Sequence, residues 1–262
     1  IMEDKMGLSS KKLLSHIGAQ IDDFDCSKKL DTSEVEFIRN SIQENHFICF
    51  KNQKLNGETL AQFTKNFGEL EAYPEKDKTK GKIEIFNVSN VSEDGEHLPA
   101  DDQRVLLQKN NSRWHTDSSY RYYPAVFSML YGQETLPPEA IGGQTQFSNM
   151  LMAYEKLSDD KKLLLEPLHQ VHSYNDIRRL EPGLPELTQS EKSNFPPVTH
   201  PLIRVHPDRN YKKSLFFTSN TSLEIGGMSL DEGRDLHKWL VDYISNPEFC
   251  YTHYWDLNDL VM

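Results

Sequence analysis

The sequence predicts a mainly β fold with helical decoration, of the double-stranded β-helix or jelly-roll type. Short apolar runs of strand length recur from residue 46 onward, and helical patterns fall before and between them. The chain of 262 residues has the size of one large domain, and its sequence contains no repeat, low-complexity run or linker. We therefore expect residues 1–262 to form a single domain.

Helical patterns occur in several parts of the sequence. They cover residues 31–43, 57–67, 149–166 and 229–244. Asp31 precedes Glu34 by three residues, as in a capping box at the start of a helix. Ser229 and Glu232 give the same signal before the last segment, where apolar residues recur with helical spacing. Ser158 can cap a second helix within residues 149–166.

Strand signals are separated by two long polar segments. The predicted strands cover residues 46–50, 83–88, 125–131, 144–147, 202–205, 214–217, 249–255 and 259–262. Residues 90–111 have the composition of a polar loop. Residues 175–197 are weakly patterned and carry several prolines. Loops of this length within a domain are usually functional lids or disordered segments.

Charge and cysteine content narrow the classes of partner. The formal net charge of −11 disfavours nucleic acid and anionic membranes, since both reward clustered Lys and Arg. Cys26, Cys49 and Cys250 are odd in number and widely spaced, so we expect neither a disulfide framework nor a thiolate zinc site. No apolar run approaches the roughly 20 residues that cross a membrane. We expect a cytoplasmic protein that acts on a small molecule. Whether it forms a homo-oligomer is left open by the sequence.

The segment Trp114–Tyr120 carries the strongest indication of chemistry. In an extended backbone, residues two apart face the same side, so His115 and Asp117 would lie together. Two His and one carboxylate hold ferrous iron in a facial triad, which leaves positions open for substrate and dioxygen. The plainer alternative is a structural histidine, which is the commoner role for an isolated His in a strand.

Further segments give this pair a context. After Phe67–Leu70, the chain carries Trp114–Tyr120, Gly142–Phe147, Thr199–Pro207 and Asp259–Met262. In order and spacing these segments resemble the taurine dioxygenase/dichlorophenoxyacetate dioxygenase (TauD/TfdA) family, from about residue 30 to the end. The resemblance implies a 2-oxoglutarate-dependent dioxygenase that uses Fe(II) and dioxygen. It also implies hydroxylation or desaturation of a small anionic organic substrate.

The resemblance assigns roles to individual residues. His115 and Asp117 would be iron ligands, and Thr145 would help to hold a carboxylate of 2-oxoglutarate. Asn111 and Tyr73 fall where members of the family contact substrate. The plain structural alternatives are a loop-capping role for Asn111 and a core position for Tyr73.

The third iron ligand of the family is a His, and a nearby Arg binds 2-oxoglutarate. Both lie downstream of the strand that begins at Asp259, so we expect them beyond residue 262 and regard the domain as lacking its C-terminal end. The rival interpretation is a truncated, inactive site. Five histidines within the chain are weaker candidates for the third ligand, namely His169, His172, His200, His206 and His253.

Two other function classes stay open at this point. One is a member of the family that has lost catalysis and acts as a binding module. The other is a cupin-type metalloprotein with different chemistry. Tyr120, Tyr122 and Tyr123 could line a substrate pocket or belong to the core. Arg178 and Arg179 could clamp a carboxylate from a lid, although a surface pair is the plainer interpretation.

Overall fold

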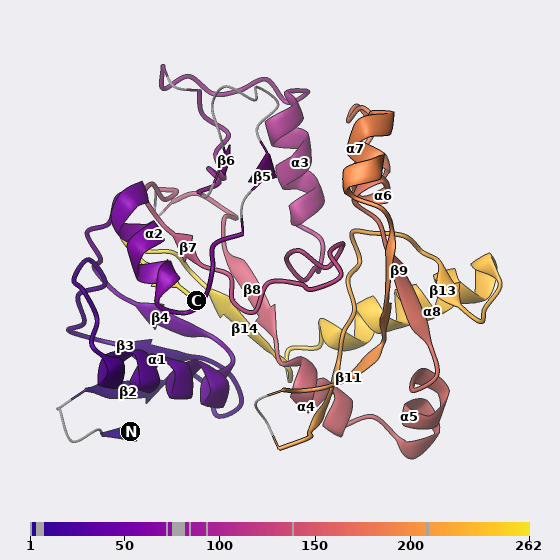
Figure 1. Cartoon of the computed structure of the whole chain (residues 1–262), viewed down its shortest axis with the longest axis horizontal. Helices are drawn as coiled ribbons and strands as arrows, with labels where there is room; N and C mark the ends of the chain where they lie inside the picture. The colour runs from indigo at the N-terminus through magenta and orange to yellow at the C-terminus, as the bar shows by residue number, and fades with distance from the viewer. Residues whose placement is uncertain are drawn as a thin grey trace. The chain divides into compact units, whose positions relative to one another are not determined.

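The computed structural model describes residues 2–3, 8–71, 73–74, 82–83, 85–92, 94–137, 139–207 and 210–262. The chain divides into two compact units, each built from separate stretches of sequence (Figure 1). The first unit comprises Ile1–Phe86, Val126–Asn149 and Asn246–Met262. The second unit comprises Asn87–Ala125 and Met150–Ser245. Each unit is described by itself below.

The first unit is built on a mixed sheet with the strand order β1-β2-β3-β4-β15-β7. Its strands are β1 (Met2–Glu3), β2 (Ser9–Lys12), β3 (Ala19–Ile21), β4 (Ile48–Phe50), β7 (Leu130–Tyr131) and β15 (Leu260–Val261). The pair β3–β4 is parallel, and the other pairs are antiparallel. Two further pairs are β5 (Tyr73–Pro74) with β6 (Lys82–Ile83), and β8 (Thr145–Ser148) with β14 (Cys250–His253).

Two helices complete the first unit, α1 (Thr32–Asn45) and α2 (Gly57–Lys65). Asp31 and Glu34 form the predicted capping box at the start of α1. Phe37 and Ile38 turn inward from α1, and Phe63 turns inward from α2. The helices therefore form where a local cap coincides with an apolar face that the sheet can cover.

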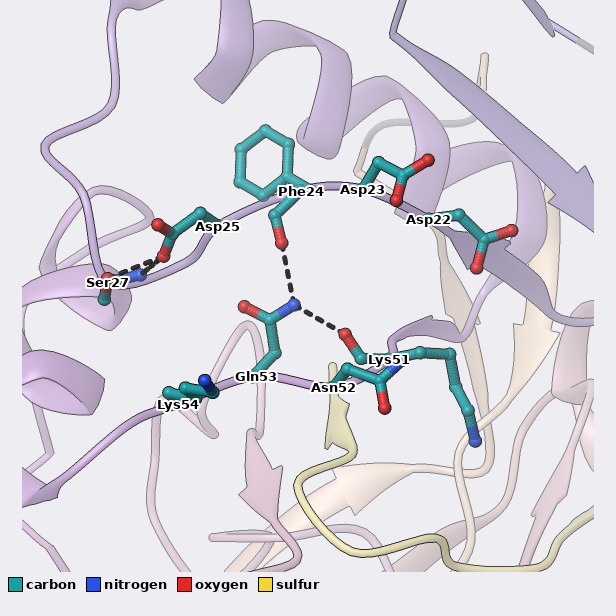
Figure 2. Close-up of a pocket in the computed structure, with 9 residues that line it drawn as sticks. All are labelled: Asp22, Asp23, Phe24, Asp25, Ser27, Lys51, Asn52, Gln53 and Lys54. Atoms are coloured by element: carbon teal, nitrogen blue, oxygen red, sulfur yellow. Dashed lines mark hydrogen bonds between the residues drawn. The ribbon is translucent and has the colours of Figure 1, made fainter.

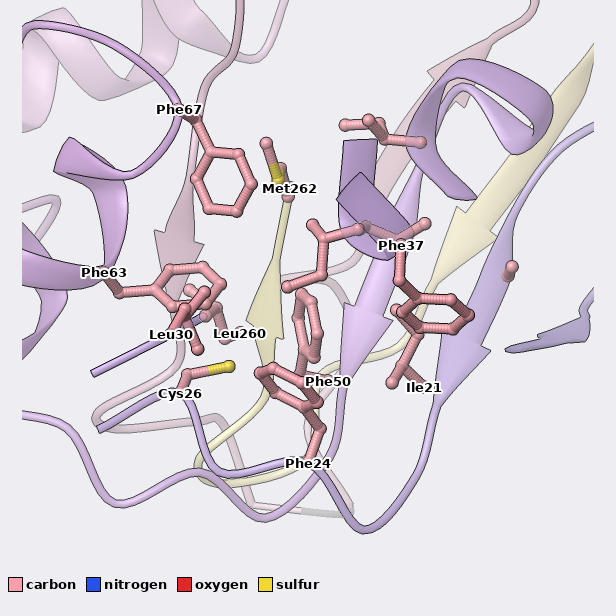
Figure 3. Close-up of a cluster of buried hydrophobic side chains, with 14 of the residues drawn as sticks. Ile21, Phe24, Cys26, Leu30, Phe37, Phe50, Phe63, Phe67, Leu260 and Met262 are labelled. Carbon is pink, nitrogen blue, oxygen red and sulfur yellow. The ribbon is translucent and has the colours of Figure 1, made fainter. Parts of the chain in front are cut away.

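The core of the first unit surrounds β4 (Figure 3). Side chains alternate along a strand, so Ile48 and Phe50 enter one cluster while Phe47 and Cys49 enter another on the opposite face. The Phe50 ring lies 5.7 Å from the Phe63 ring, edge to face. Burial on both faces of the strand explains why residues 47–50 are all apolar and do not alternate with polar residues.

The second unit combines helices with two small antiparallel sheets, ordered β10-β9-β13 and β11-β12. The strands are β9 (His169–His172), β10 (Val198–Pro201), β11 (Ile203–Val205), β12 (Lys213–Leu215) and β13 (Ile225–Gly226). The helices are α3 (Gln103–Asn111), α4 (Met150–Glu155), α5 (Asp159–Leu165), α6 (Tyr174–Arg179), α7 (Gln189–Asn194) and α8 (Leu230–Ile244). Among the described residues, no helix is long and apolar enough to cross a membrane.

Helix α8 shows how this unit is packed. Ser229 and Glu232 form the predicted capping box, and Leu236, Leu240 and Ile244 are buried on one face. At Gly233 an added Cβ would lie 2.9 Å from the Leu223 carbonyl oxygen. The helix can therefore approach that backbone closely only with glycine at this position.

The structure shows mixed sheets with helices, and it corrects several predicted boundaries. Residues 90–111 are not all loop, because α3 occupies their second half, and residues 175–197 contain most of α6 and all of α7. The strand predicted at 125–131 is confined to β7, and the described residues 85–88 form no strand. The missed elements are the short helices α3, α6 and α7. Helices this short show too few apolar residues on one face for a helical period to be recognised in the sequence.

Candidate active site

His115 and Asp117 lie together in the second unit. The Nε2 atom of His115 is 3.2 Å from Oδ1 of Asp117. The backbone differs from the predicted strand, because residues 117–120 form a turn and Ser118 has a positive φ of 56°. His115 therefore lies just before a turn, and Asp117 is the first residue of that turn.

The other nitrogen of the His115 ring is fixed by the main chain. Nδ1 lies 2.8 Å from the carbonyl oxygen of Arg113. A carbonyl oxygen can only accept, so Nδ1 carries the hydrogen and donates it. Metal-bound histidines usually make this kind of contact through the nitrogen that does not bind the metal. The arrangement directs the lone pair of neutral His115 at Nε2 toward Asp117.

The charge balance of the pair suits a cation. Burial disfavours a charged imidazole, but the hydrogen bonds with the Asp117 carboxylate and the Arg113 carbonyl outweigh it and raise the pKa of His115. A proton shared between Nε2 and Oδ1 thus stabilises the pair, and a metal ion can take its place between the same two donors. The donor set, one imidazole and one carboxylate, fits two positions of a facial triad.

The Trp114 carbonyl is also held. It accepts hydrogen bonds from the backbone N–H of Ser219 at 2.7 Å and from the Ser219 hydroxyl at 2.9 Å. Because Trp114 directly precedes His115, this contact restrains the backbone next to the histidine. Sequence inspection missed Ser219, since a hydrogen bond to a main-chain carbonyl leaves no motif.

Thr145 lies in the first unit, as the first residue of β8 opposite His253. Its Oγ1 lies 3.0 Å from the indole nitrogen of Trp255. An indole N–H can only donate, so Thr145 accepts this bond and its own hydroxyl hydrogen remains available for an acceptor. A carboxylate oxygen is such an acceptor.

The two predicted substrate residues lie in different units. Asn111 is the last residue of α3 in the second unit and is exposed. Tyr73 belongs to β5 in the first unit, where its backbone pairs with Ile83, and its side chain lies outside the described part of the structure. The structure thus brings together His115 and Asp117, while Thr145 and Tyr73 are placed only within their own unit.

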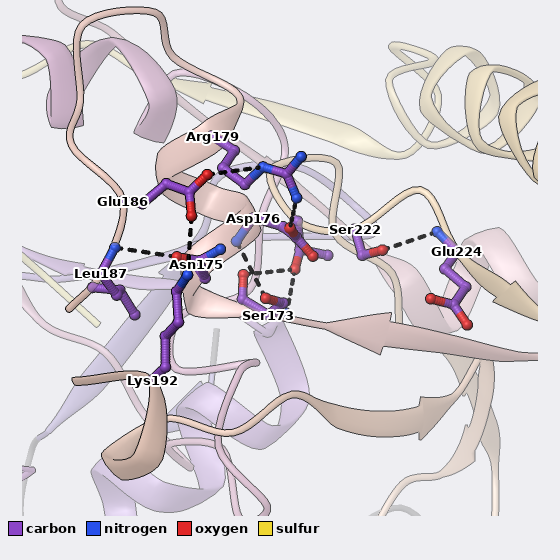
Figure 4. A network of polar contacts seen from close by, with 10 residues as sticks. Ser173, Asn175, Asp176, Arg179, Glu186, Leu187, Lys192, Ser222 and Glu224 are labelled. Carbon is purple, nitrogen blue, oxygen red and sulfur yellow. Dashed lines mark hydrogen bonds and ion pairs between the residues drawn. The ribbon is translucent and has the colours of Figure 1, made fainter. Parts of the chain in front are cut away.

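The proline-containing segment after β9 is an ordered element of the second unit (Figure 4). Glu186 lies between Lys192 at 2.9 Å and Arg179 at 3.8 Å, and Asn175 accepts from the backbone of Leu187 at 3.1 Å. Arg178 is not a surface residue, because it is buried and donates from Nε to the Pro185 carbonyl at 2.7 Å.

Aromatic rings join this segment to the turn after Asp117. The Tyr120 ring is buried, 4.8 Å from Tyr174 and 5.9 Å from Phe195. Tyr122 and Tyr123 are exposed and stack edge to face at 4.7 Å. Tyr120 is therefore a packing residue, whereas Tyr122 and Tyr123 can reach a ligand.

The histidines considered as alternative ligands have other contacts. In the described part of the second unit, no third Cys, His, Asp or Glu joins His115 and Asp117 in a compact group. His172 is fully buried against His200 and Phe216. His200 contacts the Arg121 carbonyl through Nε2 at 3.0 Å.

One compact group of potential ligands does occur among the described residues, in the first unit. Cys49, His253 and Asp259 place one donor atom each within 4.8 Å of one another. The Lys51 ammonium already lies 2.8 Å from the Asp259 carboxylate, and His253 Nε2 lies 3.1 Å from it. Burial raises the pKa of the Cys49 thiol to about 12, which keeps it protonated. We therefore assign this group to a buried ion pair beside β15.

The first unit also contains a cavity of about 380 Å³ (Figure 2). It is lined by acidic residues 22, 23 and 25 and by residues 51–54. The Gln53 amide spans it, donating to the Phe24 carbonyl at 2.7 Å and to the Lys51 carbonyl at 2.8 Å. Its lining includes none of the predicted site residues.

Comparisons with known proteins bear on this geometry. The profile of the family described as taurine catabolism dioxygenase TauD, TfdA family matches residues 9–262. The chain belongs to the TauD, TfdA family. An alpha-ketoglutarate-dependent 2,4-dichlorophenoxyacetate dioxygenase of Burkholderia sp. (strain RASC) is 33% identical, over 98% of this chain and 86% of that protein. Its counterpart in Cupriavidus pinatubonensis is 31% identical, over 98% of this chain and 89% of that protein.

Solved structures of TauD-like proteins share the fold. The crystal structure of AAD-2 in complex with Mn(II) and N-oxalylglycine matches with a TM-score of 0.84 and 33% identity, over 97% of this chain and 86% of that one. A putative alpha-ketoglutarate-dependent 2,4-D dioxygenase from Burkholderia xenovorans matches with a TM-score of 0.78 and 28% identity, over 97% and 86% of the two chains. The predicted family and enzyme class, a 2-oxoglutarate-dependent dioxygenase that uses Fe(II), are confirmed.

Proposed function

We propose that this TauD, TfdA family member oxidises a small anionic organic substrate, by hydroxylation or desaturation, with His115 and Asp117 as two of its iron ligands. The observation that carries the assignment is the contact between His115 Nε2 and Asp117 Oδ1 at 3.2 Å. The Nδ1–H bond to Arg113 supports it, because that bond leaves Nε2 as the metal-binding nitrogen.

Bound iron would supply the chemistry that couples decarboxylation of 2-oxoglutarate to oxidation of a substrate C–H bond with dioxygen. The chain's own residues bind and orient. His115 and Asp117 hold the ion through one neutral and one anionic donor.

Thr145 is our proposed contact for a carboxylate of 2-oxoglutarate. Trp255 donates to its Oγ1 at 3.0 Å and so fixes the side-chain rotamer. The hydroxyl hydrogen then points away from the indole and can donate to an anionic oxygen. A hydrogen bond to a charged group is stronger than one between neutral groups.

The substrate class is proposed from the relatives. Their names specify 2,4-dichlorophenoxyacetate and (S)-phenoxypropionate, which are carboxylates with an aromatic ring. Asn111 and Tyr73 are the proposed substrate contacts, and both stay predictions from the resemblance. Asn111 is exposed at the end of α3, where an amide can meet a ligand.

Domain organisation and location complete the proposal. We infer one oxygenase domain with the double-stranded β-helix of its family, because the family profile spans stretches of both units. A reducing, cytoplasmic environment is supported by the three cysteines, which are buried and form no disulfide with one another.

A turnover assay with the full-length protein tests the proposed function. Fe(II), 2-oxoglutarate and a panel of aryloxy acids, sulfonates and sulfate esters are mixed in air, and succinate is measured. Succinate that rises with one substrate is the expected result. The absence of both coupled and uncoupled succinate formation from an iron-loaded chain would instead support a binding module.

A further inference from the structure

We propose that Asn110 is a positioning residue for the iron site, acting through Arg113 on the tautomer and orientation of His115. This inference rests on the proposed role of His115 and Asp117 as iron ligands. It concerns a residue that contacts neither ligand and that directly precedes the exposed Asn111.

Asn110 is fully buried, although it stands in the last turn of a helix that is largely exposed. A buried amide is costly unless its polar atoms are paired. Its Nδ2 donates to the Ile177 carbonyl of α6 at 2.8 Å, and its Oδ1 accepts from Arg113 Nη1 at 2.6 Å. Both ends of the amide therefore have a defined partner, so the side chain has one orientation.

Arg113 is tied to Asn110 twice. Besides the contact between the side chains, the backbone N–H of Arg113 donates to the Asn110 carbonyl at 3.1 Å. Glu181 adds an ion pair to the guanidinium at 3.5 Å. These contacts hold the main chain and the side chain of Arg113, the residue whose carbonyl oxygen faces the His115 ring.

That carbonyl is the group that determines the state of His115. It accepts the Nδ1 hydrogen at 2.8 Å, and this contact leaves Nε2 as the nitrogen that faces Asp117. If the Arg113 carbonyl turned away, the neutral ring could carry its hydrogen on Nε2 instead, and the lone pair would then be on the wrong nitrogen. The path from Asn110 to His115 thus runs through two hydrogen bonds and one residue.

The peptide group between Trp114 and His115 is held independently of Asn110, through the Trp114 carbonyl. Ser219 holds it from another segment of the same unit, with its backbone N–H and its hydroxyl. The two peptide groups before His115 are therefore held by different parts of the unit. Such double restraint is what a ligand needs when its donor atom must stay within a fraction of an ångström.

The test compares Asn110→Leu with Arg113→Met in the full-length protein. Mn(II) affinity is measured by titration calorimetry, and the His115 tautomer is measured by long-range ¹H–¹⁵N spectroscopy of the metal-free protein at pH 8. The missing signal in His115→Gln identifies the resonance. Ser112→Ala is the control for the end of α3, because the Ser112 hydroxyl donates to the Lys109 carbonyl of the same helix. Lys109→Met is the control for Arg113→Met, because Lys109 also pairs with Glu181.

We expect each of the two test variants to weaken Mn(II) binding roughly tenfold, in line with the loss of an outer partner of a metal ligand. Both should increase the Nε2–H tautomer, and the double variant should be no weaker than the weaker single variant. Both controls should stay within about twofold of the parent. Arg113→Met keeps the Asn110–Ile177 bond, so it separates positioning of His115 from loss of helix packing.

Unchanged tautomer and affinity in a folded Arg113→Met variant would overturn the proposal, as would additive effects in the double variant. Failure of the proposed function looks different. In that case His115→Gln and Asp117→Ala themselves retain stoichiometric Mn(II) binding.

Discussion

His115 Nε2 lies 3.2 Å from Asp117 Oδ1, although neither residue belongs to a strand. Residues 117–120 form a turn, in which the Ser118 backbone is left-handed with a φ of 56°. A positive φ at a non-glycine residue has a conformational cost and is often associated with functional sites. The turn therefore presents two donors at once while the chain continues into the buried Tyr120.

The Thr145 hydroxyl gives a first prediction. Thr145→Val preserves the shape of the side chain but removes the donor to 2-oxoglutarate. Loss of a hydrogen bond to a charged group costs roughly 1.5–3 kcal/mol. We expect the KM for 2-oxoglutarate to rise by about 10- to 100-fold, with a smaller change in kcat, in steady-state succinate assays. Thr252→Val, one residue from the position opposite Thr145 in the same sheet, is the matched control. An equal KM for 2-oxoglutarate in both variants would show that Thr145 does not contact 2-oxoglutarate.

His172 gives a prediction for stability against pH. Burial lowers the pKa of His172 from 6.5 to about 3 in the folded chain. The folded chain therefore favours the neutral ring. The contribution of neutral His172 to the free energy of unfolding is complete above pH 6.5 and is lost as the pH falls from 6.5 toward 3. Between pH 7.5 and pH 5 the loss is about 2 kcal/mol.

Urea unfolding at these two pH values measures that loss. His172→Leu should flatten the dependence by most of this amount. Val171→Ala, a variant without a titrating group in the same strand, should leave it unchanged. Equal slopes in the parent and in His172→Leu would show that His172 is not the group responsible.

Lys51 gives a prediction for the buried ion pair. Its ammonium lies 2.8 Å from Asp259, whose side chain is fully buried. Lys51→Met should destabilise the protein by about 2–4 kcal/mol, because Asp259 would be left without its cation. Adding Asp259→Asn should recover part of that loss. Chemical denaturation measures both, with the exposed Lys54→Met as the control. Zn(II) that stabilises an Asp117→Ala variant at stoichiometric concentration would contradict our assignment of this cluster.

Local signals in the sequence predicted the parts of the fold that depend on neighbouring residues. The capping boxes at Asp31 and Ser229 are confirmed, because they involve groups only three residues apart. Family resemblance and the spacing of two residues likewise identified His115 and Asp117 as neighbours, although the backbone between them was predicted wrongly.

The remaining features depend on groups that are distant in the sequence. Asn110 and Ser219 act by hydrogen bonds with backbone atoms of other elements, and such bonds do not require a particular pattern of residues. The resemblance drew attention to Asn111, which is exposed, and gave no signal for the adjacent Asn110, whose amide is buried. Helices α6 and α7 were missed because prolines flank them and their turns are held by local polar contacts such as those of Glu186.

The most direct test of the account is the spectrum of the iron site. Anaerobic Fe(II)-loaded full-length protein is mixed with 2-oxoglutarate, and the visible absorption is recorded for the parent, Asp117→Ala and the exposed control Asp101→Ala. We predict a new charge-transfer band in the parent and in Asp101→Ala, and its loss with the bound iron in Asp117→Ala. An unchanged spectrum in the iron-loaded parent, or a full band in Asp117→Ala, would contradict the account.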